Sequence, residues 1–264
     1  MGVLNATPDS FSDGGQFLAV EDAVSRAAEM LSEGASIIDI GGESTRPGAD
    51  PVSDDVETDR VLPVVEALVD RFPEAILSVD TYKPAVAEAA LDAGAHIVND
   101  VTGLRHHPEM AEVAAAAGAP LVIMHSTGAP GDLTSPGEYA DVTAEVRDAL
   151  ARAVDTATEA GVDSLVIDPG FGFGKTHTQN LRLINEIDEL LTLDRPLLMG
   201  VSRKSTIGAT LGTPDAPVPT EDRLFGSLGA TAVGVMRGAT LVRTHDVAAT
   251  VDMLTVLSAT LHTS

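Results

Sequence analysis

Short runs of aliphatic and β-branched residues recur along the chain, and each is followed by a longer stretch with the spacing of an amphipathic helix. The runs are continuous rather than alternating, which is typical of parallel strands buried on both faces. The predicted strands are Met1–Leu4, Ser36–Ile40, Ile76–Val79, Ile97–Asp100, Leu121–Met124, Leu165–Asp168, Leu197–Gly200 and Thr240–Arg243. The predicted helices are Val20–Ser32, Asp54–Arg71, Pro84–Ala93, Pro108–Ala117, Tyr139–Ala160, Gln179–Leu191, Asp222–Arg237 and Val247–Leu261.

Several predicted helices end at a glycine, which supplies the left-handed residue that a helix cap requires. These glycines are Gly34, Gly94, Gly118, Gly161 and Gly238. Strict alternation of strands and helices predicts an α/β protein, a parallel (β/α)8 TIM barrel formed as one domain over residues 1–264. A doubly wound open sheet is the alternative, but no fingerprint glycine loop follows the first strand. That strand begins at residue 1, so either it is short or the native chain begins upstream.

Composition narrows the class of protein. The chain has 264 residues, 44% of them hydrophobic, which is enough to build a large core. It has no cysteine, which excludes disulfide scaffolds, thiolate metal sites and a cysteine nucleophile. No run approaches the roughly 18 apolar residues of a membrane span. The first residues have neither a basic start nor an apolar signal core, so we expect a cytoplasmic protein.

The charge is strongly negative: 40 acidic residues against 16 lysines and arginines give a net charge of −24. Such a chain would repel nucleic acid and anionic membranes, so neither is expected as a partner. An acidic surface poor in lysine indicates adaptation to high salt, with an acidic mesophilic protein as the alternative. The only lysines are Lys83, Lys175 and Lys204, and their rarity makes each a candidate for a functional role.

Polar residues follow every predicted strand. They are Asn5, Asp39, Asp80, Asn99, Asp100, His125, Asp168, Ser202, Arg203, Lys204, Arg243 and His245. Asp and Asn also cap helices well, so any one of them has a structural explanation. Since the carboxyl ends of the strands carry the chemistry in a TIM barrel, polar residues at all eight ends predict an active site there.

Three loops after strands are unusual. Residues 5–15 and 41–50 exceed the usual two to six residues of such connections, and we expect them to act as lids. The loop DPGFGFGKT, residues 168–176, has the glycines of a phosphate-binding loop but lacks the P-loop spacing.

The charge types predict the ligand. Cationic groups at strand ends, placed against the negative net charge, indicate an anionic substrate such as a phosphate. These groups are Arg46, Arg203, Lys204, Arg243 and His245. A second set, Asp80, Asn99 and Asp168, offers acceptors and an amide that could read the N–H edge of a flat heterocycle. Together the two sets predict a heterocycle that carries phosphate.

At these residues the sequence resembles the dihydropteroate synthases, within the pterin-binding TIM-barrel family. The resemblance spans nearly the whole chain, through LNATPDSFSDGG, IDIGGESTRPGA, SVDTYKP, VNDVTG, DPGFGFGKT, GVSRKS and RTHDV in the family's order. It implies condensation of 6-hydroxymethyl-7,8-dihydropterin diphosphate with 4-aminobenzoate, giving 7,8-dihydropteroate and pyrophosphate in folate biosynthesis. It also implies a Mg²⁺ cofactor and a homodimer, for which the weakly charged helices Asp222–Arg237 and Val247–Leu261 offer a face.

The resemblance implies roles for individual residues. The catalytic residues would be Lys204, Asp80, Arg46 and Asp13. The pterin would be bound by Asp80, Asn99, Asp168 and Lys204, and the diphosphate by Thr45, Arg46, Arg243 and His245. The 4-aminobenzoate would meet Thr45, Pro47, Gly172, Phe173, Ser202 and Arg203. Asn5 would help to hold Mg²⁺, and Thr7 with Asp13 would order over the leaving group.

Two other functions remain open. A pterin-binding methyltransferase that moves a methyl group from methyltetrahydrofolate to a corrinoid would share the pterin acids, but it has no use for diphosphate-binding cations such as Arg46 and Arg243. A non-catalytic pterin-binding subunit would not need an intact set of leaving-group residues. Histidines after the fourth and fifth strands, at 106, 107 and 125, are expected to be solvated loop residues rather than a metal pair.

Overall fold

The computed structural model describes residues 1–6, 16–44, 50–128, 132–133 and 135–261, and for residues 16–18 the backbone alone. Its strands are β1 (Gly2–Asn5), β2 (Ile37–Gly41), β3 (Ile76–Asp80), β4 (Ile97–Asp100), β5 (Leu121–Met124), β6 (Leu165–Asp168), β7 (Leu198–Met199) and β8 (Leu241–Val242). Its α-helices are α1 (Gln16–Ser32), α2 (Asp54–Arg71), α3 (Pro84–Asp92), α4 (Met110–Ala117), α5 (Val142–Glu159), α6 (His177–Asn185), α7 (Ser205–Leu211), α8 (Leu224–Met236) and α9 (Val247–Leu261). Two 3₁₀ helices, η2 (Ile187–Leu193) and η3 (Thr220–Arg223), precede β7 and α8.

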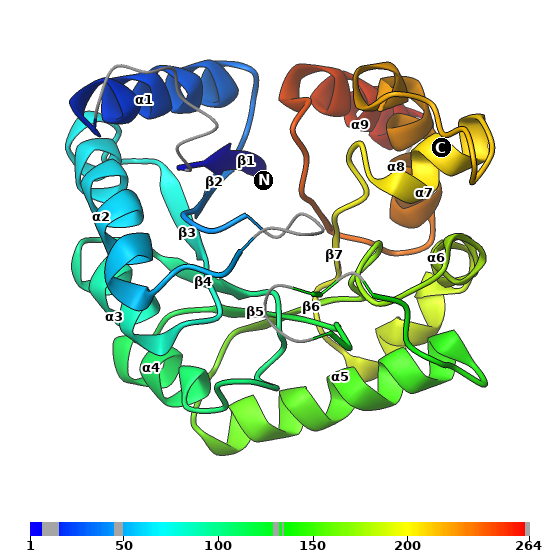
Figure 1. Ribbon diagram of the computed structural model, residues 1–264, viewed down its shortest axis with the longest axis horizontal. Coiled ribbons are helices and arrows are strands. Elements are labelled where there is room, and N and C mark those ends of the chain that lie inside the picture. Colours follow the sequence, from blue (N-terminus) through cyan, green and yellow to red (C-terminus); the bar gives the residue numbers. More distant parts are fainter. Residues whose placement is uncertain (7–15, 45–49, 129–131, 134, 262–264) are drawn as a thin grey trace.

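The strands close into a ring. Strands β1 to β6 form one parallel sheet in sequence order, and β7 pairs in parallel with β8. Parallel bridges join the two sets, from Ile167 of β6 to Leu197 and from Gly2 of β1 to Thr244. Figure 1 shows the helices arranged around these strands. The predicted (β/α)8 barrel is therefore confirmed, and the open-sheet alternative is wrong.

The helices turn apolar faces toward the strands, as their spacing predicts. Ser53 caps the N-terminus of α2: its side chain accepts a hydrogen bond from the Val56 backbone, and acidic residues occupy the first turn of the helix. Its buried side chains include Val61, Val65 and Leu68, which join the core between helices and strands. None of the helices in the described ranges combines the length and apolar character that a membrane span requires.

The predicted glycine caps are present at Gly34, Gly94, Gly118, Gly161 and Gly238, all of which have positive φ. The helix predictions need three corrections. The predicted helix Gln179–Leu191 is two elements, because a capping box between Thr176 and Gln179 starts α6 early and Glu186 leaves helical geometry. The predicted helix Asp222–Arg237 begins as 3₁₀ turns in η3, and α7 was not predicted.

Candidate active site at the carboxyl ends of the strands

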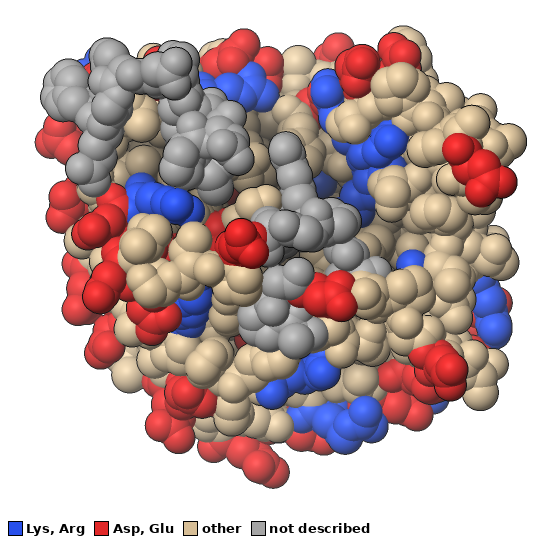
Figure 2. Space-filling view, in the orientation of Figure 1, with Lys and Arg blue, Asp and Glu red and all other residues tan. Residues whose placement is uncertain are grey.

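The barrel brings side chains from distant parts of the sequence to one rim. Asp80 ends β3 and is paired in register with Asn99 of β4, while Asp168 ends β6. Lys204 and Arg243 follow β7 and β8. Because all strands are parallel, these residues meet at the same end of the barrel. Figure 2, seen from the direction of Figure 1, shows acidic side chains scattered over this face, most of them around its margin and some near its middle.

Arg243 lies between two carboxylates. Its Nε donates to Asp39 Oδ2 and its Nη2 donates to Asp80 Oδ2, both at 2.6 Å. The Asn99 amide donates to the same Asp39 oxygen at 3.1 Å. Burial alone would lower the pKa of Arg243, but the attraction of Asp39 and Asp80 outweighs it and raises that pKa. Arg243 is therefore a permanent cation at the mouth of the barrel.

The two carboxyls predicted to bind the pterin, Asp80 and Asp168, have pKa values raised by burial, which favours their neutral forms. Burial raises the pKa of Asp80 to about 7, with Arg243 opposing the shift and Asp39, Glu57 and Asp100 adding to it. Burial also raises the pKa of Asp168, although Lys204 and a 2.7 Å hydrogen bond from the Gly170 backbone oppose it. A carboxyl with a pKa near neutrality changes charge under working conditions, which is typical of functional sites.

Lys204 connects two predicted subsites. Its ammonium donates to the Phe171 carbonyl and lies 4.3 Å from the centroid of the Phe173 ring. Burial lowers the pKa of Lys204 to about 8, against the opposing charge of Asp168. Gly172 has φ +83°, and a Cβ there would lie 2.8 Å from Lys204 Cδ, so only glycine allows this approach.

Ser202 and Arg203, which follow β7, contact the residues that follow β8. His245 Nδ1 lies 3.1 Å from Ser202 Oγ, which also accepts the His245 backbone N–H at 3.2 Å. Burial lowers the pKa of His245 to about 4, so the imidazole is neutral at pH 7. Arg203 has φ +56° and binds both oxygens of Asp246, so its guanidinium is already paired.

The structure does not describe every predicted site residue. Thr7, Asp13, Thr45, Arg46 and Pro47 all lie outside the described residues. Asn5 is described: it ends β1, is half-buried, and is paired in register with Gly41 beside Asp80.

Lys175 has a buried role that the sequence indicated only by the rarity of lysine. Its ammonium donates at 2.9 Å to the carbonyls of Gly170 and Phe173, and lies 3.0 Å from His125 Nδ1. Burial lowers the pKa of Lys175 to about 7, with Asp168 opposing, and lowers that of His125 to about 3. The prediction of a solvated loop histidine is therefore wrong for His125, which is buried beside Lys175. Through the carbonyls of Gly170 and Phe173, Lys175 stabilises the loop of residues 168–176 from within. Among the described residues, no group of three or more acidic or histidine side chains is arranged to hold a metal.

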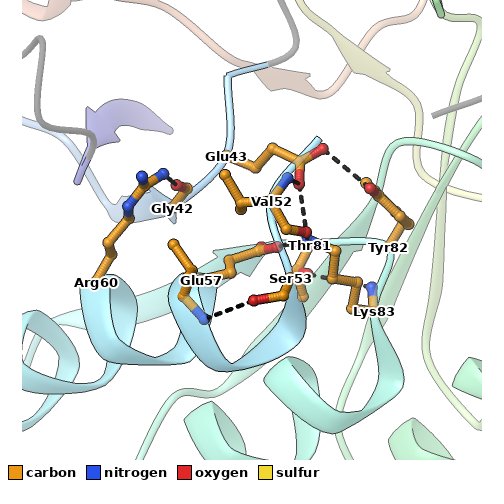
Figure 3. Close-up of polar contacts among 10 residues, drawn as sticks. Gly42, Glu43, Val52, Ser53, Glu57, Arg60, Thr81, Tyr82 and Lys83 are labelled. Carbon is orange, nitrogen blue, oxygen red and sulfur yellow. Dashed lines mark hydrogen bonds and ion pairs between the residues drawn. The ribbon is translucent and has the colours of Figure 1, made fainter. Parts of the chain in front are cut away.

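Lys83 organises a second buried cluster beside β3. Its ammonium lies 2.6 Å from Glu43 and 2.5 Å from Glu57, and it donates to the Val52 carbonyl at 2.7 Å. Tyr82 donates to Glu43 at 3.0 Å, and the Val52 N–H donates to Glu43 at 3.1 Å (Figure 3). The cluster joins the end of β2 to the start of α2 and to the chain that follows Asp80.

Comparisons with known proteins agree on the family. A family model described as pterin binding enzyme matches residues 1–245. The chain is similar to the dihydropteroate synthase of Escherichia coli K12, with 45% identity over 99% of this chain and 91% of that protein. It is 47% identical to a probable bifunctional folylpolyglutamate synthase/dihydropteroate synthase of Haloferax volcanii, over 94% of this chain but 29% of that protein. The structure of Xanthomonas albilineans dihydropteroate synthase with 4-aminobenzoic acid is similar, with a TM-score of 0.91, 46% identity, and coverage of 100% and 93% of the two chains.

Proposed function

The chain belongs to the dihydropteroate synthase family of pterin-binding enzymes, and we propose that the rim cluster around Arg243 carries out the family's reaction. The enzyme is a transferase of folate biosynthesis that condenses 6-hydroxymethyl-7,8-dihydropterin diphosphate with 4-aminobenzoate, giving 7,8-dihydropteroate and pyrophosphate. The observation that carries the residue assignments is the meeting of Asp80 and Arg243 at one rim, with Lys204 beside Asp168.

The pterin is assigned to Asp80, Asn99, Asp168 and Lys204. A pterin presents an amino group and ring N–H donors along one edge and a carbonyl oxygen beside them. Carboxylates accept from such donors, an amide does both, and an ammonium donates to a carbonyl. The partial burial of this set strengthens each charge-assisted hydrogen bond, because water competes less there.

The diphosphate is assigned to Arg243 and His245, together with Thr45 and Arg46 outside the described residues. Asp39 and Asp80 engage Nε and Nη2 of Arg243, so the remaining edge of the guanidinium is the one we assign to phosphate oxygens. His245 is neutral at pH 7 and contributes a hydrogen bond rather than a charge.

The reaction breaks the bond between the pterin methylene and the diphosphate oxygen, and forms a bond from that carbon to the arylamine nitrogen. The methylene cation is delocalised into the pterin ring, and ionised Asp80 stabilises its positive charge. Arg243 stabilises the negative charge that pyrophosphate carries away. The neutral arylamine attacks, and the arylammonium that forms is acidic enough to lose its proton without a strong base.

The 4-aminobenzoate is assigned to Gly172, Phe173, Ser202 and Arg203, with Thr45 and Pro47 outside the described residues. The Phe173 ring offers an apolar wall, and Gly172 leaves the space through which Lys204 reaches the pterin. The Arg203 guanidinium is paired with Asp246, so we assign its backbone and stem to shaping the pocket.

Mg²⁺ is assigned to Asn5. A single amide oxygen fits an ion that enters on a diphosphate, because Mg²⁺ keeps several waters and takes few protein ligands at such sites. When bound, the ion would neutralise charge on the departing pyrophosphate. Asn5 holds a hard oxygen at the end of β1, next to the strand that leads to Arg243.

The remaining assignments concern the assembly and its setting. We propose one pterin-binding domain over residues 1–264, a cytoplasmic location, and a homodimer formed through α8 and α9. Those helices expose Phe225, Met236 and Val256, with 83%, 61% and 67% of each residue accessible. Large apolar side chains exposed together favour a protein partner over water.

The test of the function is pyrophosphate release from the pterin diphosphate, measured with and without 4-aminobenzoate and Mg²⁺. Release that requires both supports the synthase and the assigned ion. Release with no dependence on 4-aminobenzoate would mean hydrolysis, and no release would leave a non-catalytic pterin-binding protein. Methyl transfer from methyltetrahydrofolate, assayed in parallel, tests the methyltransferase alternative, which the diphosphate-binding assignment of Arg243 argues against.

A further inference from the structure

Asp39 lies in the middle of β2, below the rim. Gly41, two residues further on, would place a Cβ 3.6 Å from Asp80 Cβ, so this face of β2 points into the barrel. Asp39 therefore also points inward, and none of its surface is accessible. Burying a carboxylate costs free energy unless hydrogen bonds and an opposite charge compensate for the lost water, so the partners of Asp39 matter.

Its partners are two residues assigned to the substrate. Asp39 Oδ2 accepts from Arg243 Nε at 2.6 Å and from Asn99 Nδ2 at 3.1 Å. Arg243 arrives from β8 and Asn99 from β4, so one oxygen joins strands on two sides of β2.

The chemistry of Asp39 fixes the direction of both partners. An ionised carboxylate can only accept hydrogen bonds, and the two ends of an amide differ, so Asn99 must turn its NH₂ toward Asp39. The Asn99 carbonyl oxygen is then the end left for the pterin. The guanidinium is planar and rigid, so fixing Nε at Asp39 and Nη2 at Asp80 also fixes its remaining edge.

We propose that Asp39 is a positioning residue: from beneath the site, its carboxylate orients the Asn99 amide and the Arg243 guanidinium toward the pterin diphosphate. Asp39 contacts neither substrate in this arrangement. The inference rests on the substrate roles proposed above for Asn99, Asp80 and Arg243.

Asp39 and Asp80 both pair with Arg243. Removing the charge of Asp39 should therefore change the pKa of Asp80, which loss of a purely structural residue would not do. The charged groups that act on Asp80 include Arg243 after β8, Lys204 after β7, Asp39 in β2, Glu57 in α2 and Asp100 in β4. Burial is the main cause of the raised pKa of Asp80, and the negative charge of Asp39 adds to it. Removing that charge takes away one repulsion on Asp80 and one competitor for Arg243, which Asp168 still attracts, so the pKa of Asp80 falls.

The experiment compares Asp39→Asn with a matched variant, Ser78→Ala. Ser78 pairs in register with Asp39, is equally buried, and its hydroxyl has no partner among the described residues. For Asp39→Asn we expect the KM for pterin diphosphate to rise at least about tenfold, as for loss of a hydrogen bond to a charged group. The KM for 4-aminobenzoate changes less than about twofold, because its assigned contacts do not involve Asp39.

The pH profile of kcat/KM provides the second measurement. If ionised Asp80 is the active form, its acid limb moves to lower pH in Asp39→Asn by about half a unit or more, and Ser78→Ala leaves it in place. Titration of the substrate diphosphate is the same in all three proteins and cancels. An unmoved acid limb, or losses that fall equally on both substrates, would overturn the proposal.

A third measurement is made on the wild-type protein, so it does not depend on whether Asp39→Asn folds. In the wild-type protein, the Nε–H of Arg243 should exchange slowly with water by NMR, with Arg243→Lys identifying its signal. Fast exchange would overturn the proposed contact. If wild-type enzyme shows no pyrophosphate release, the proposed function fails, but slow exchange would still support the contact between Asp39 and Arg243.

Discussion

The Lys204 ammonium lies 4.3 Å from the centroid of the Phe173 ring, so a residue assigned to the pterin faces one assigned to 4-aminobenzoate. On the assignments proposed above, Lys204 lies where the two substrates would meet. We expect Lys204→Ala to lower kcat at least about tenfold, because a charge-assisted hydrogen bond and a cation–π contact are lost together. Circular dichroism should stay unchanged, since Lys204 is only half-buried.

Phe173→Leu is the matched variant for this contact, since it keeps an apolar wall but removes the ring. It should raise the KM for 4-aminobenzoate more than the KM for pterin diphosphate. Wild-type turnover in Lys204→Ala, with an intact fold, would contradict the assignment of Lys204 to both subsites.

The fold was largely predictable because its strands and helices are encoded locally. Predicted strand bounds agree with the structure to within two residues, since buried parallel strands are short β-branched runs between turn residues. Helix α7 was missed because its seven residues, STIGATL, are too few to show a helical period. It also follows Lys204, which offers no side-chain cap to mark its start.

The site was less predictable because its contacts join residues far apart in the sequence. Asp39 and Arg243 are separated by 204 residues, and nothing near either one predicts their pairing. The rarity of lysine pointed to Lys83 and Lys175, but not to their partners. Which carboxylate or carbonyl each ammonium meets depends on how neighbouring strand ends pack, and the barrel alone determines that.

The buried cluster around Lys83 makes a prediction about stability. The side chain of Lys83 is 6% exposed, and those of Glu43 and Glu57 are 8% and 1% exposed. Lys83→Met removes the cation and leaves both carboxylates buried without it, which should lower the free energy of unfolding by about 3–5 kcal/mol. Denaturant unfolding measures this loss.

Two control variants sharpen the result. Arg237→Met breaks an exposed ion pair with Asp188 and should leave the free energy of unfolding nearly unchanged. The double variant Lys83→Met, Glu57→Gln removes one of the two buried carboxylate charges that Lys83→Met leaves unpaired. Its free energy of unfolding should lie between those of Lys83→Met and the wild type. A Lys83→Met protein as stable as wild type would mean that Glu43 and Glu57 become hydrated or protonated with little loss of folding free energy.

The exposed apolar face of α8 and α9 predicts the assembly. If Phe225 packs against a second copy of the chain, Phe225→Asp places a charge in the interface and should shift dimer toward monomer. Multi-angle light scattering measures the mass directly. The matched variant Val56→Asp alters a residue of similar kind, 41% exposed on α2 on the opposite side of the barrel, and should leave the mass unchanged (Figure 1). A wild-type monomer at every salt concentration would refute the homodimer.

The net charge of −24 makes the last prediction. Like-charge repulsion should weaken the folded state in dilute buffer, where the Debye length of about 30 Å at 0.01 M spans the barrel. At about 1 M salt that length falls to about 3 Å and the repulsion is screened. We therefore expect Tm to rise by several degrees or more between dilute buffer and molar KCl. Activity should respond in the opposite direction, because the attraction that we assign to Arg243 for diphosphate is itself electrostatic and would be screened too. Tm and the KM for pterin diphosphate should thus rise together. A Tm that stays flat from about 0.05 to 2 M KCl would exclude salt adaptation as the reason for the acidic surface, while the assignments of Asp80, Arg243 and Lys204 would stand, since they depend on contacts inside the barrel.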